Sequence, residues 1–245
     1  MTDEAIWLVG FHAVLGALES DRPVEVVWLQ QGRRDGRARR MEEAARRRGV
    51  PVRVVPRARL DRLAGGGAHT GCAARVGAVA WAAVRDVVAP EGRPGRVLLL
   101  DDVTDPHNVG AVIRTCVAFG VDGLVVAGPS APPLAGAASR AAAGLVDRIP
   151  IARVTVAADA LVELRGEGYW VFGADAAGVP VGEVSVPDRW VMCVGSEERG
   201  LRAKTRSVVD EWVAVPMADG VESLNLSVSA AVLLYELSRT PTEHR

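Results

Sequence analysis

Polar side chains and glycines gather in three segments, each directly after an apolar run that reads as a strand. Asparagine and serine at such turns can cap a helix, and glycine lets a ligand approach the backbone closely. Glycines at the carboxyl end of a strand also suit a bound cofactor, because ligands of open α/β sheets collect there. The residues concerned are Asn108, Gly110 and Arg114 in the first segment, Gly195, Ser196, Glu197 and Gly200 in the second, and Pro216, Ser223 and Asn225 in the third.

The first segment continues into a helix whose two faces differ. Gly110 and Arg114 lie together off its apolar stripe, so Arg114 is expected to point away from the core. The stripe consists of Val109, Val112, Ile113, Cys116 and Val117. Taken singly, an Arg of this kind is also an ordinary surface residue, and the glycines and asparagines are also ordinary turn and capping residues. Three such strand ends in one domain favour a single functional site.

Other site chemistries find less support in the sequence. The dinucleotide fingerprint GxGxxG does not occur. Cys116 lies on the apolar helical stripe and Cys193 lies inside a strand, where inert core thiols are expected rather than nucleophiles. With Cys72 they make three cysteines without metal-ligand spacing, so neither zinc nor disulfides are expected.

The elements that would position these residues follow from hydrophobic periodicity. Near the start, strands at 24–30, 51–55 and 75–81 and a helix at 37–49 predict a small α/β module. Residues 86–95 are rich in Pro, Gly and charge and read as a linker. Beyond it, helical stretches separate the predicted strands, which indicates a mostly parallel sheet. Those strands are expected at 96–100, 123–127, 168–174, 190–194 and 212–215.

Charge is distributed unevenly along this chain of 245 residues. Its 49% hydrophobic and 24% charged residues are typical of a globular protein, and the net charge is −1. Residues 33–62, however, hold 12 Arg against four acidic residues, a local balance of +8. Such a stripe could follow a phosphate backbone, or it could be a solvated helix face with internal ion pairs. For the first alternative, the candidate RNA-binding residues are Arg39, Arg40, Arg46 and Arg47.

The start of the chain predicts a cytoplasmic protein. The apolar stretch 8–18 is about half the roughly 20 residues that a membrane-spanning helix needs. The first four residues, Met-Thr-Asp-Glu, carry acid where a secretion signal would carry base.

In order and spacing, the three segments resemble the SpoU (TrmH) family of RNA ribose 2′-O-methyltransferases, within the SPOUT superfamily. The matching motifs are Asn108 with Gly110 and Arg114, the run Gly195-Ser196-Glu197 with Gly200-Leu201, and Pro216 with Ser223-Leu224-Asn225-Leu226-Ser227. The resemblance covers residues 96–240. Residues 6–80 resemble the ribosomal-protein-like substrate-binding domain of a subgroup that methylates a guanosine ribose of 23S rRNA, with Thr70 where that subgroup usually has Gln.

The resemblance implies an α/β fold with a mostly parallel sheet and a C-terminal trefoil knot, preceded by a small α/β domain. Its domains would be an RNA substrate-binding domain at 1–85, a linker at 86–95 and the methyltransferase domain at 96–245. It also implies a homodimer that acts on RNA and uses S-adenosylmethionine without any metal. The cofactor would be held largely by backbone groups of Gly195, Val215, Met217, Ser223 and Leu224.

The catalytic residues implied by the family pattern are Arg114, Glu197, Asn108 and Asn225. Since a guanidinium is a poor proton acceptor, Arg114 is expected to grip the neighbouring phosphate and to stabilise the developing alkoxide. Glu197 would orient Arg114 or the nucleotide, and the two asparagines would fix the local geometry. A tRNA ribose 2′-O-methyltransferase of the same family, and a non-catalytic RNA-binding or ribosome-assembly protein, are the alternatives.

Overall fold

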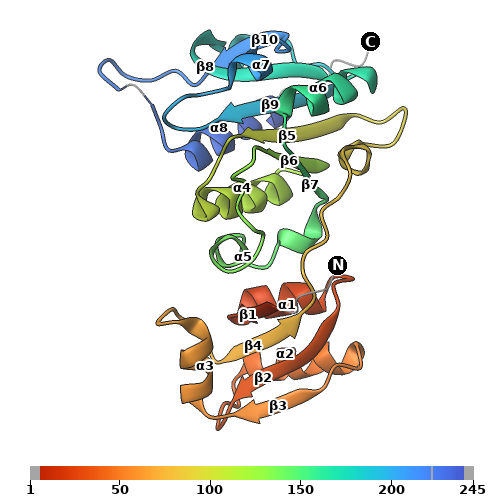
Figure 1. Cartoon of the computed structure of the whole chain (residues 1–245), viewed down its shortest axis with the longest axis vertical. Coiled ribbons are helices and arrows are strands. Elements are labelled where there is room, and N and C mark those ends of the chain that lie inside the picture. Colours follow the sequence, from red (N-terminus) through yellow and green to blue (C-terminus); the bar gives the residue numbers. More distant parts are fainter. Residues whose placement is uncertain (1–5, 222, 240–245) are drawn as a thin grey trace. The chain divides into compact units, whose positions relative to one another are not determined.

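Two separate sheets organise the chain in the computed structural model, which describes residues 6–221 and 223–239 (Figure 1). Each sheet is the centre of one compact unit. The first unit combines the chain up to residue 80 with residues 133–148, and the second combines residues 81–132 with the chain from 149 onward. Residues 133–148 therefore pack with helix α1 (Phe11–Leu18), which precedes them by more than 110 positions.

The first unit has a four-stranded sheet in the order β1-β4-β2-β3. β2 runs parallel to β3, and β4 is antiparallel to both of its neighbours. Its elements are β1 (Ile6–Val9), α1 (Phe11–Leu18), β2 (Val24–Gln30), α2 (Gly36–Arg47), β3 (Val52–Val55), α3 (Arg57–Ala64) and β4 (Cys72–Val76). The predicted strand at 24–30 is confirmed. The prediction of a strand at 75–81 was wrong, because β4 ends at Val76, where the Gly77 N–H turns to the carbonyl of Pro23.

Side-chain alternation places two different layers on this sheet. Leu8 and Ala74 share a buried cluster with Met41 of α2 and with residues of α1. The next residues along the strands point to the opposite face, where Val9 and Ala73 pack against Leu60 of α3. Helices α1 and α2 thus cover one face of the sheet, and α3 covers part of the other.

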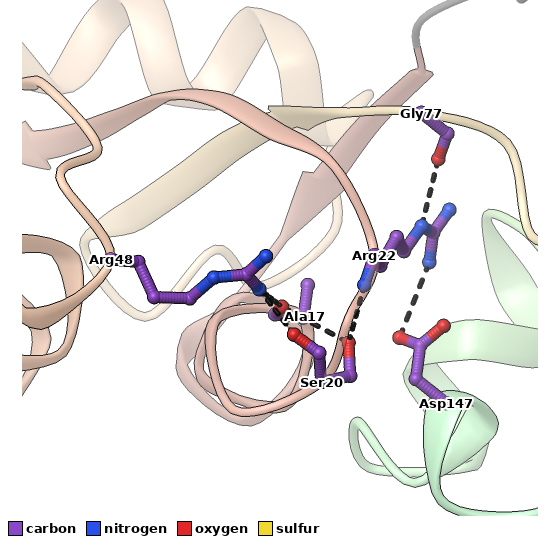
Figure 2. A network of polar contacts seen from close by, with 6 residues as sticks. All are labelled: Ala17, Ser20, Arg22, Arg48, Gly77 and Asp147. Atoms are coloured by element: carbon purple, nitrogen blue, oxygen red, sulfur yellow. Dashed lines mark hydrogen bonds and ion pairs between the residues drawn. The ribbon is translucent and has the colours of Figure 1, made fainter.

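Residues 133–148, which include α5 (Ala137–Ala141) and the 3₁₀ turn Val146–Arg148, pack on α1. Gly16 and Gly144 allow this approach, because a Cβ on Gly16 would lie 2.0 Å from the carbonyl oxygen of Gly144. Arg22 forms a buried ion pair with Asp147 at 3.6 Å and donates from Nε to the Gly77 carbonyl at 2.8 Å (Figure 2). The first unit is therefore built from two distant stretches of the chain.

The second unit has a six-stranded sheet in the order β10-β8-β9-β5-β6-β7, with every neighbouring pair parallel. This confirms the predicted mostly parallel sheet. Its strands are β5 (Gly95–Asp101), β6 (Gly123–Ala127), β7 (Ile151–Val154), β8 (Trp170–Pro180), β9 (Arg189–Gly195) and β10 (Glu211–Ala214). Its helices are α4 (Pro106–Ala118), α6 (Ala157–Gly166), α7 (Ala203–Arg206) and α8 (Leu226–Arg239), with 3₁₀ turns at Val84–Val87 and Val181–Glu183.

Helices cover both faces of this parallel sheet, which explains its continuous apolar strands. On one face, Leu161 and Leu164 of α6 pack against Leu99 of β5 and its neighbours. On the other face, α8 packs on β9 and α4 packs on β6, and these two helices also contact each other (Figure 1). The arrangement leaves the carboxyl ends of β5, β9 and β10 free to carry the loops of the three motifs.

Candidate functional site

A pocket opens in the second unit where β9 and β10 end, beside the middle of β8. β8 contributes Ala174, the ends of β9 and β10 contribute Val194 and Ala214, and the start of α8 contributes Leu226. The wall is mostly apolar side chains and exposed backbone, which suits an adenine-like ring and a few backbone hydrogen bonds. All five residues predicted to hold the cofactor line this one pocket: Gly195, Val215, Met217, Ser223 and Leu224.

Gly195 is required by the turn that follows β9. A Cβ at this position would lie 2.0 Å from the carbonyl carbon of Gly200. Because Gly200 contributes a backbone atom to this clash, no side-chain rotation can relieve it. Gly200 itself has a φ of 63°, and it pairs with Ser196 in a short bridge. The two glycines of the second motif therefore fold the loop back on itself and keep its backbone at the pocket wall.

Asp101, fully buried at the end of β5, holds the next part of the same loop. Its carboxylate accepts hydrogen bonds from the backbone N–H of Arg202 at 2.9 Å, from Arg202 Nε at 2.7 Å and from Thr205 Oγ1 at 2.6 Å. A buried carboxylate with this many donors anchors the loop between β9 and α7. Sequence reasoning missed this anchor, although an acidic residue directly after the apolar run at 97–100 was a usable signal.

Asn108, Glu197 and Asn225 come together from three distant segments. Glu197 Oε1 accepts hydrogen bonds from Asn108 Nδ2 at 3.1 Å, from Asn225 Nδ2 at 2.9 Å and from the backbone N–H of Leu226 at 3.0 Å. Asn225 Nδ2 also lies 3.0 Å from Asn108 Oδ1. Glu197 is thus the centre of the cluster and joins the start of α4 to the start of α8.

Asn225 has a second task, since it caps α8. Its Oδ1 accepts from the backbone N–H of Ser227 at 3.0 Å and from Ser227 Oγ at 2.6 Å. The Glu197 carboxylate lies at the same helix start, where the helix dipole favours negative charge. The same Asn225 side chain therefore caps α8 and takes part in the cluster, so α8 begins at the site.

A second hollow adjoins the first pocket. It is lined by Asp102 of the loop after β5, by Asn108 at the start of α4, and by Glu198 and Arg199 of the loop after β9. Ser196, Glu197 and Leu226 line both hollows. The Glu197 cluster therefore forms the wall shared by two neighbouring hollows, one mainly apolar and one bordered by polar and charged side chains.

Asp175 brings a carboxylate to the first pocket from β8. The backbone N–H of Ala177, and after it the guanidinium of Arg206 at 2.9 Å, hold the pKa of this carboxyl below its usual range. Arg206 in turn lies 4.3 Å from the centre of the Trp212 ring. The pocket therefore holds the carboxylate of Asp175 in addition to that of Glu197.

Arg114 is exposed on α4, as predicted, and the apolar stripe of that helix is buried except for Val117, which is half-buried. The structure does not bring Arg114 into the cluster. Within residues 6–221 and 223–239, no hydrogen bond or ion pair connects its guanidinium to Glu197 or to either asparagine.

The predicted RNA-binding residues Arg39, Arg40, Arg46 and Arg47 are all exposed on α2, whose buried face consists of Ala38, Met41, Ala44 and Ala45. Of these arginines, Arg40 pairs with Glu19 at 3.3 Å.

The three cysteines are buried, which confirms the predicted core positions of Cys116 and Cys193. Burial raises the pKa of Cys72 to about 11 and also raises the pKa of Cys116 and of Cys193. In the described part of the chain, no group of three or more His, Cys, Asp or Glu side chains could hold a metal ion. None of the described helices is long and apolar enough to cross a bilayer.

Comparison with known proteins gives matches to both units. Residues 95–235 match the SpoU rRNA Methylase family, and residues 7–81 match the family described as RNA 2′-O ribose methyltransferase substrate binding. The 23S rRNA (guanosine-2′-O-)-methyltransferase RlmB of Bordetella pertussis (strain Tohama I) is 39% identical over 238 residues, 95% of this chain and 96% of the relative. The RlmB of Xanthomonas campestris pv. campestris is 36% identical over 244 residues, 98% of each chain.

Among solved structures, the SpoU methyltransferase AviRb from Streptomyces viridochromogenes, in complex with the cofactor AdoMet, superposes with a TM-score of 0.79. It is 25% identical in sequence, and the superposition covers 96% of this chain and 89% of AviRb.

Proposed function

Because this chain belongs to the SpoU rRNA methylase family and is an S-adenosylmethionine-dependent RNA 2′-O-methyltransferase, we propose that its substrate is a guanosine ribose of 23S rRNA. The observation that carries the proposal is similarity along 95% or more of the chain, which includes the region 7–81 that matches the substrate-binding family, to two enzymes with that named specificity. An rRNA substrate would place the protein in the cytoplasm, where ribosomes are assembled.

The first pocket fits S-adenosylmethionine by its chemistry. Its wall of apolar side chains and exposed backbone around Gly195 would take the adenine ring, and an added Cβ at Gly195 would collide with the backbone of Gly200. We propose that Val215, Met217, Ser223 and Leu224 complete this binding surface, and that Asp175 faces the polar part of the cofactor. When bound, S-adenosylmethionine supplies a methyl group on a sulfonium, whose positive charge disappears during the transfer.

The second hollow would take the target ribose, and Glu197 would lie between this ribose and the cofactor. Glu197 Oε1 is occupied by its three donors, whereas Oε2 has no hydrogen-bond partner in the part of the chain that the structure describes. We propose that Oε2 accepts a hydrogen bond from the nucleotide and so orients the 2′-hydroxyl. Alignment of this kind dominates an in-line methyl transfer, because the reacting atoms must be collinear and close.

Arg114 would act on the RNA rather than on the cluster. Its exposed guanidinium can bind a phosphate in a two-pronged manner and stabilise negative charge as it develops on the ribose oxygen. Asn108 and Asn225 position Glu197 and do not need to touch the substrate. In this assignment the proton leaves the 2′-hydroxyl for water.

We propose two finer features of the fold from family membership, a C-terminal trefoil knot and a homodimer. In support of the knot, three stretches of the C-terminal region, around 195, 215 and 225, converge on one pocket. In support of the dimer, Val228, Val232 and Tyr235 form an exposed apolar stripe on α8, with 47%, 37% and 49% of their surface accessible. An exposed stripe of this kind is typical of a surface that another chain covers.

Mapping ribose methylation in a strain that lacks the gene tests the proposed substrate. We expect one guanosine of 23S rRNA to lose its 2′-O-methyl group while tRNA methylation is unchanged. A loss from tRNA alone would favour the tRNA enzyme of the same family, and no loss from either RNA would favour a non-catalytic RNA-binding protein.

A further inference from the structure

Two tryptophans lie on the face of the first unit's sheet that α1 and α2 do not cover. The ring centres of Trp7 in β1 and Trp28 in β2 are 4.2 Å apart, with the ring planes tilted by 48°. Arg59 of α3 places its guanidinium 4.5 Å from the centre of the Trp28 ring. Both indoles are half-buried at the edge of the Val9 and Ala73 cluster, so part of each remains open to solvent.

Arginines surround this pair. Strand register places Arg75 opposite Trp7 and Arg53 opposite Trp28, so these side chains share the tryptophan face. Of the acidic residues, Asp61 pairs with Arg57 at 3.6 Å and Glu25 pairs with Arg75 at 3.3 Å. Together, β1 to β4 and α3 carry five arginines against these two carboxylates, namely Arg53, Arg57, Arg59, Arg62 and Arg75.

We propose that Trp7, Trp28 and Arg59 form a stacking platform for an unpaired nucleotide of the RNA substrate. Indole rings and the guanidinium plane both accept a stacked base, and the surrounding arginines would pair with the adjoining phosphates. A duplex offers no free base face, so the platform selects single-stranded RNA. The proposal rests on the proposed function, since it assumes that this unit binds RNA.

The platform is distinct from the arginine stripe on α2. Met41 of α2 packs on the Leu8 and Ala74 face, whereas Trp28 packs on the opposite face beside Leu60 of α3. The α2 stripe offers charge alone and would bind duplex and single strand by their phosphates. The tryptophan face combines charge with aromatic surface and would bind only unpaired bases.

Binding of a labelled oligouridylate and of a labelled RNA duplex to the full chain, followed by fluorescence anisotropy, tests the platform. We expect Trp28→Leu, which keeps an apolar side chain but removes the aromatic face, to weaken oligouridylate binding by about 5-fold or more. Duplex affinity should change less than about 2-fold, and Trp28→Phe should restore most of the lost affinity. The control, Arg39→Ala/Arg40→Ala/Arg46→Ala/Arg47→Ala, should weaken both ligands and flatten the salt dependence.

Arg59→Gln is a second variant, because its exposed side chain can be changed without opening the core. It should also weaken oligouridylate binding selectively, while duplex affinity, which depends on α2 of the same unit, stays unchanged as a measure of intact folding. The proposal is overturned if Trp28→Leu and Arg59→Gln both bind oligouridylate like the wild type, or lose duplex affinity to the same extent. Methylation of 23S rRNA by the wild-type protein is measured in parallel. If the wild type methylates 23S rRNA, such a result overturns the platform but leaves the proposed substrate intact.

Discussion

At the scale of single residues, Glu197 is the most connected member of the candidate site. Its Oε1 accepts three hydrogen bonds, and its side chain lines both hollows. We expect Glu197→Gln to remain folded but to lose about 10-fold or more in methyl-transfer rate, because an amide at this position weakens the orientation of the nucleotide. Glu163→Gln, an exposed carboxylate on α6 that lines neither hollow, is the matched control and should be near wild type. Equal activity of both variants in a methyl-incorporation assay would contradict the role of Glu197.

Arg114 provides a sharper test. It is exposed, and it forms no hydrogen bond or ion pair with another residue that the structure describes. Arg114→Ala should keep the unfolding temperature and the cofactor affinity of the wild type but lose about 10²-fold in rate, the scale of a lost electrostatic contact to the transition state. Arg114→Lys keeps the charge without the two-pronged grip. If Arg114→Lys recovers little of the methyl-transfer rate, bidentate phosphate binding is favoured. Near wild-type turnover by Arg114→Ala would refute the assignment of Arg114 to the site.

The sequence predicts which of these residues meet but not how they are joined. Glycine, asparagine and serine after strands mark the pocket, and Asn108, Glu197 and Asn225 do form one cluster. That Glu197 is the common acceptor, and that Arg114 stays apart from it, depends on side-chain directions that no sequence pattern encodes. The buried anchor Asp101 was missed for a related reason, since its partners lie about 100 positions away.

At the scale of elements, the turn after β9 depends on backbone that approaches without room for a side chain. We expect Gly195→Ala to abolish detectable S-adenosylmethionine binding, because the added Cβ would lie 2.0 Å from the Gly200 carbonyl carbon. Gly166→Ala is the control in the same unit, since its Cβ would meet nothing within 4 Å. Calorimetric titration of both variants is the measurement, and intact binding by Gly195→Ala would show that this turn does not form the pocket wall.

Among the elements, most strands were predictable from their apolar runs. The predicted strand at 123–127 is confirmed residue for residue as β6, since it is buried on both faces. The four-residue edge strands β3 and β10 were also predicted, at 51–55 and 212–215. β1 and β7, which have four residues each as well, were not predicted, because so short a segment carries little periodicity of its own. The strand predicted at 75–81 was wrong because the chain bends after Val76. The apolar residues that follow this bend leave the sheet.

At the scale of the whole molecule, the first unit depends on a buried ion pair between two distant stretches of chain. The side chains of Arg22 and Asp147 are 3% and 12% exposed. Burial raises the pKa of Asp147, and the nearby guanidinium partly offsets that rise. Arg22→Met removes the offset and should destabilise this unit by about 3 kcal/mol at neutral pH, because an uncompensated buried carboxylate remains.

The loss should depend on pH in a defined direction. With the folded-state pKa of Asp147 above its ordinary value of 3.8, the folded state binds the proton more tightly than the unfolded state. Stability of Arg22→Met should therefore rise as the pH falls through the raised pKa towards 3.8. Urea unfolding, with hydrogen exchange in residues 133–148, is the measurement.

Two further variants serve as controls for the ion pair. Arg22→Met/Asp147→Leu should recover most of the stability and lose the pH dependence in this range. Breaking the exposed pair of Arg40 and Glu19 by Arg40→Met should cost less than about 1 kcal/mol. A stability loss in Arg22→Met that does not change with pH would show that packing, rather than the charge on Asp147, is responsible.

The domain plan read from the sequence, with boundaries at 85 and 95, stays a prediction. A linear reading cannot assign residues 133–148 to the first unit, because the contact of Gly16 with Gly144 joins positions 128 apart. The mostly parallel sheet was predictable from alternating apolar and helical runs. The return of a later segment to an earlier module was not.

The most direct test of the central claim is the chemical identity of the methylated product. Purified protein is incubated with a 23S rRNA transcript and S-adenosylmethionine that carries a labelled methyl group, and the RNA is digested to nucleosides for mass spectrometry. We predict labelled 2′-O-methylguanosine as the single product, formed equally well in the presence of a metal chelator. Label on a base, label on a ribose other than that of guanosine, or the absence of any incorporated label would contradict the account.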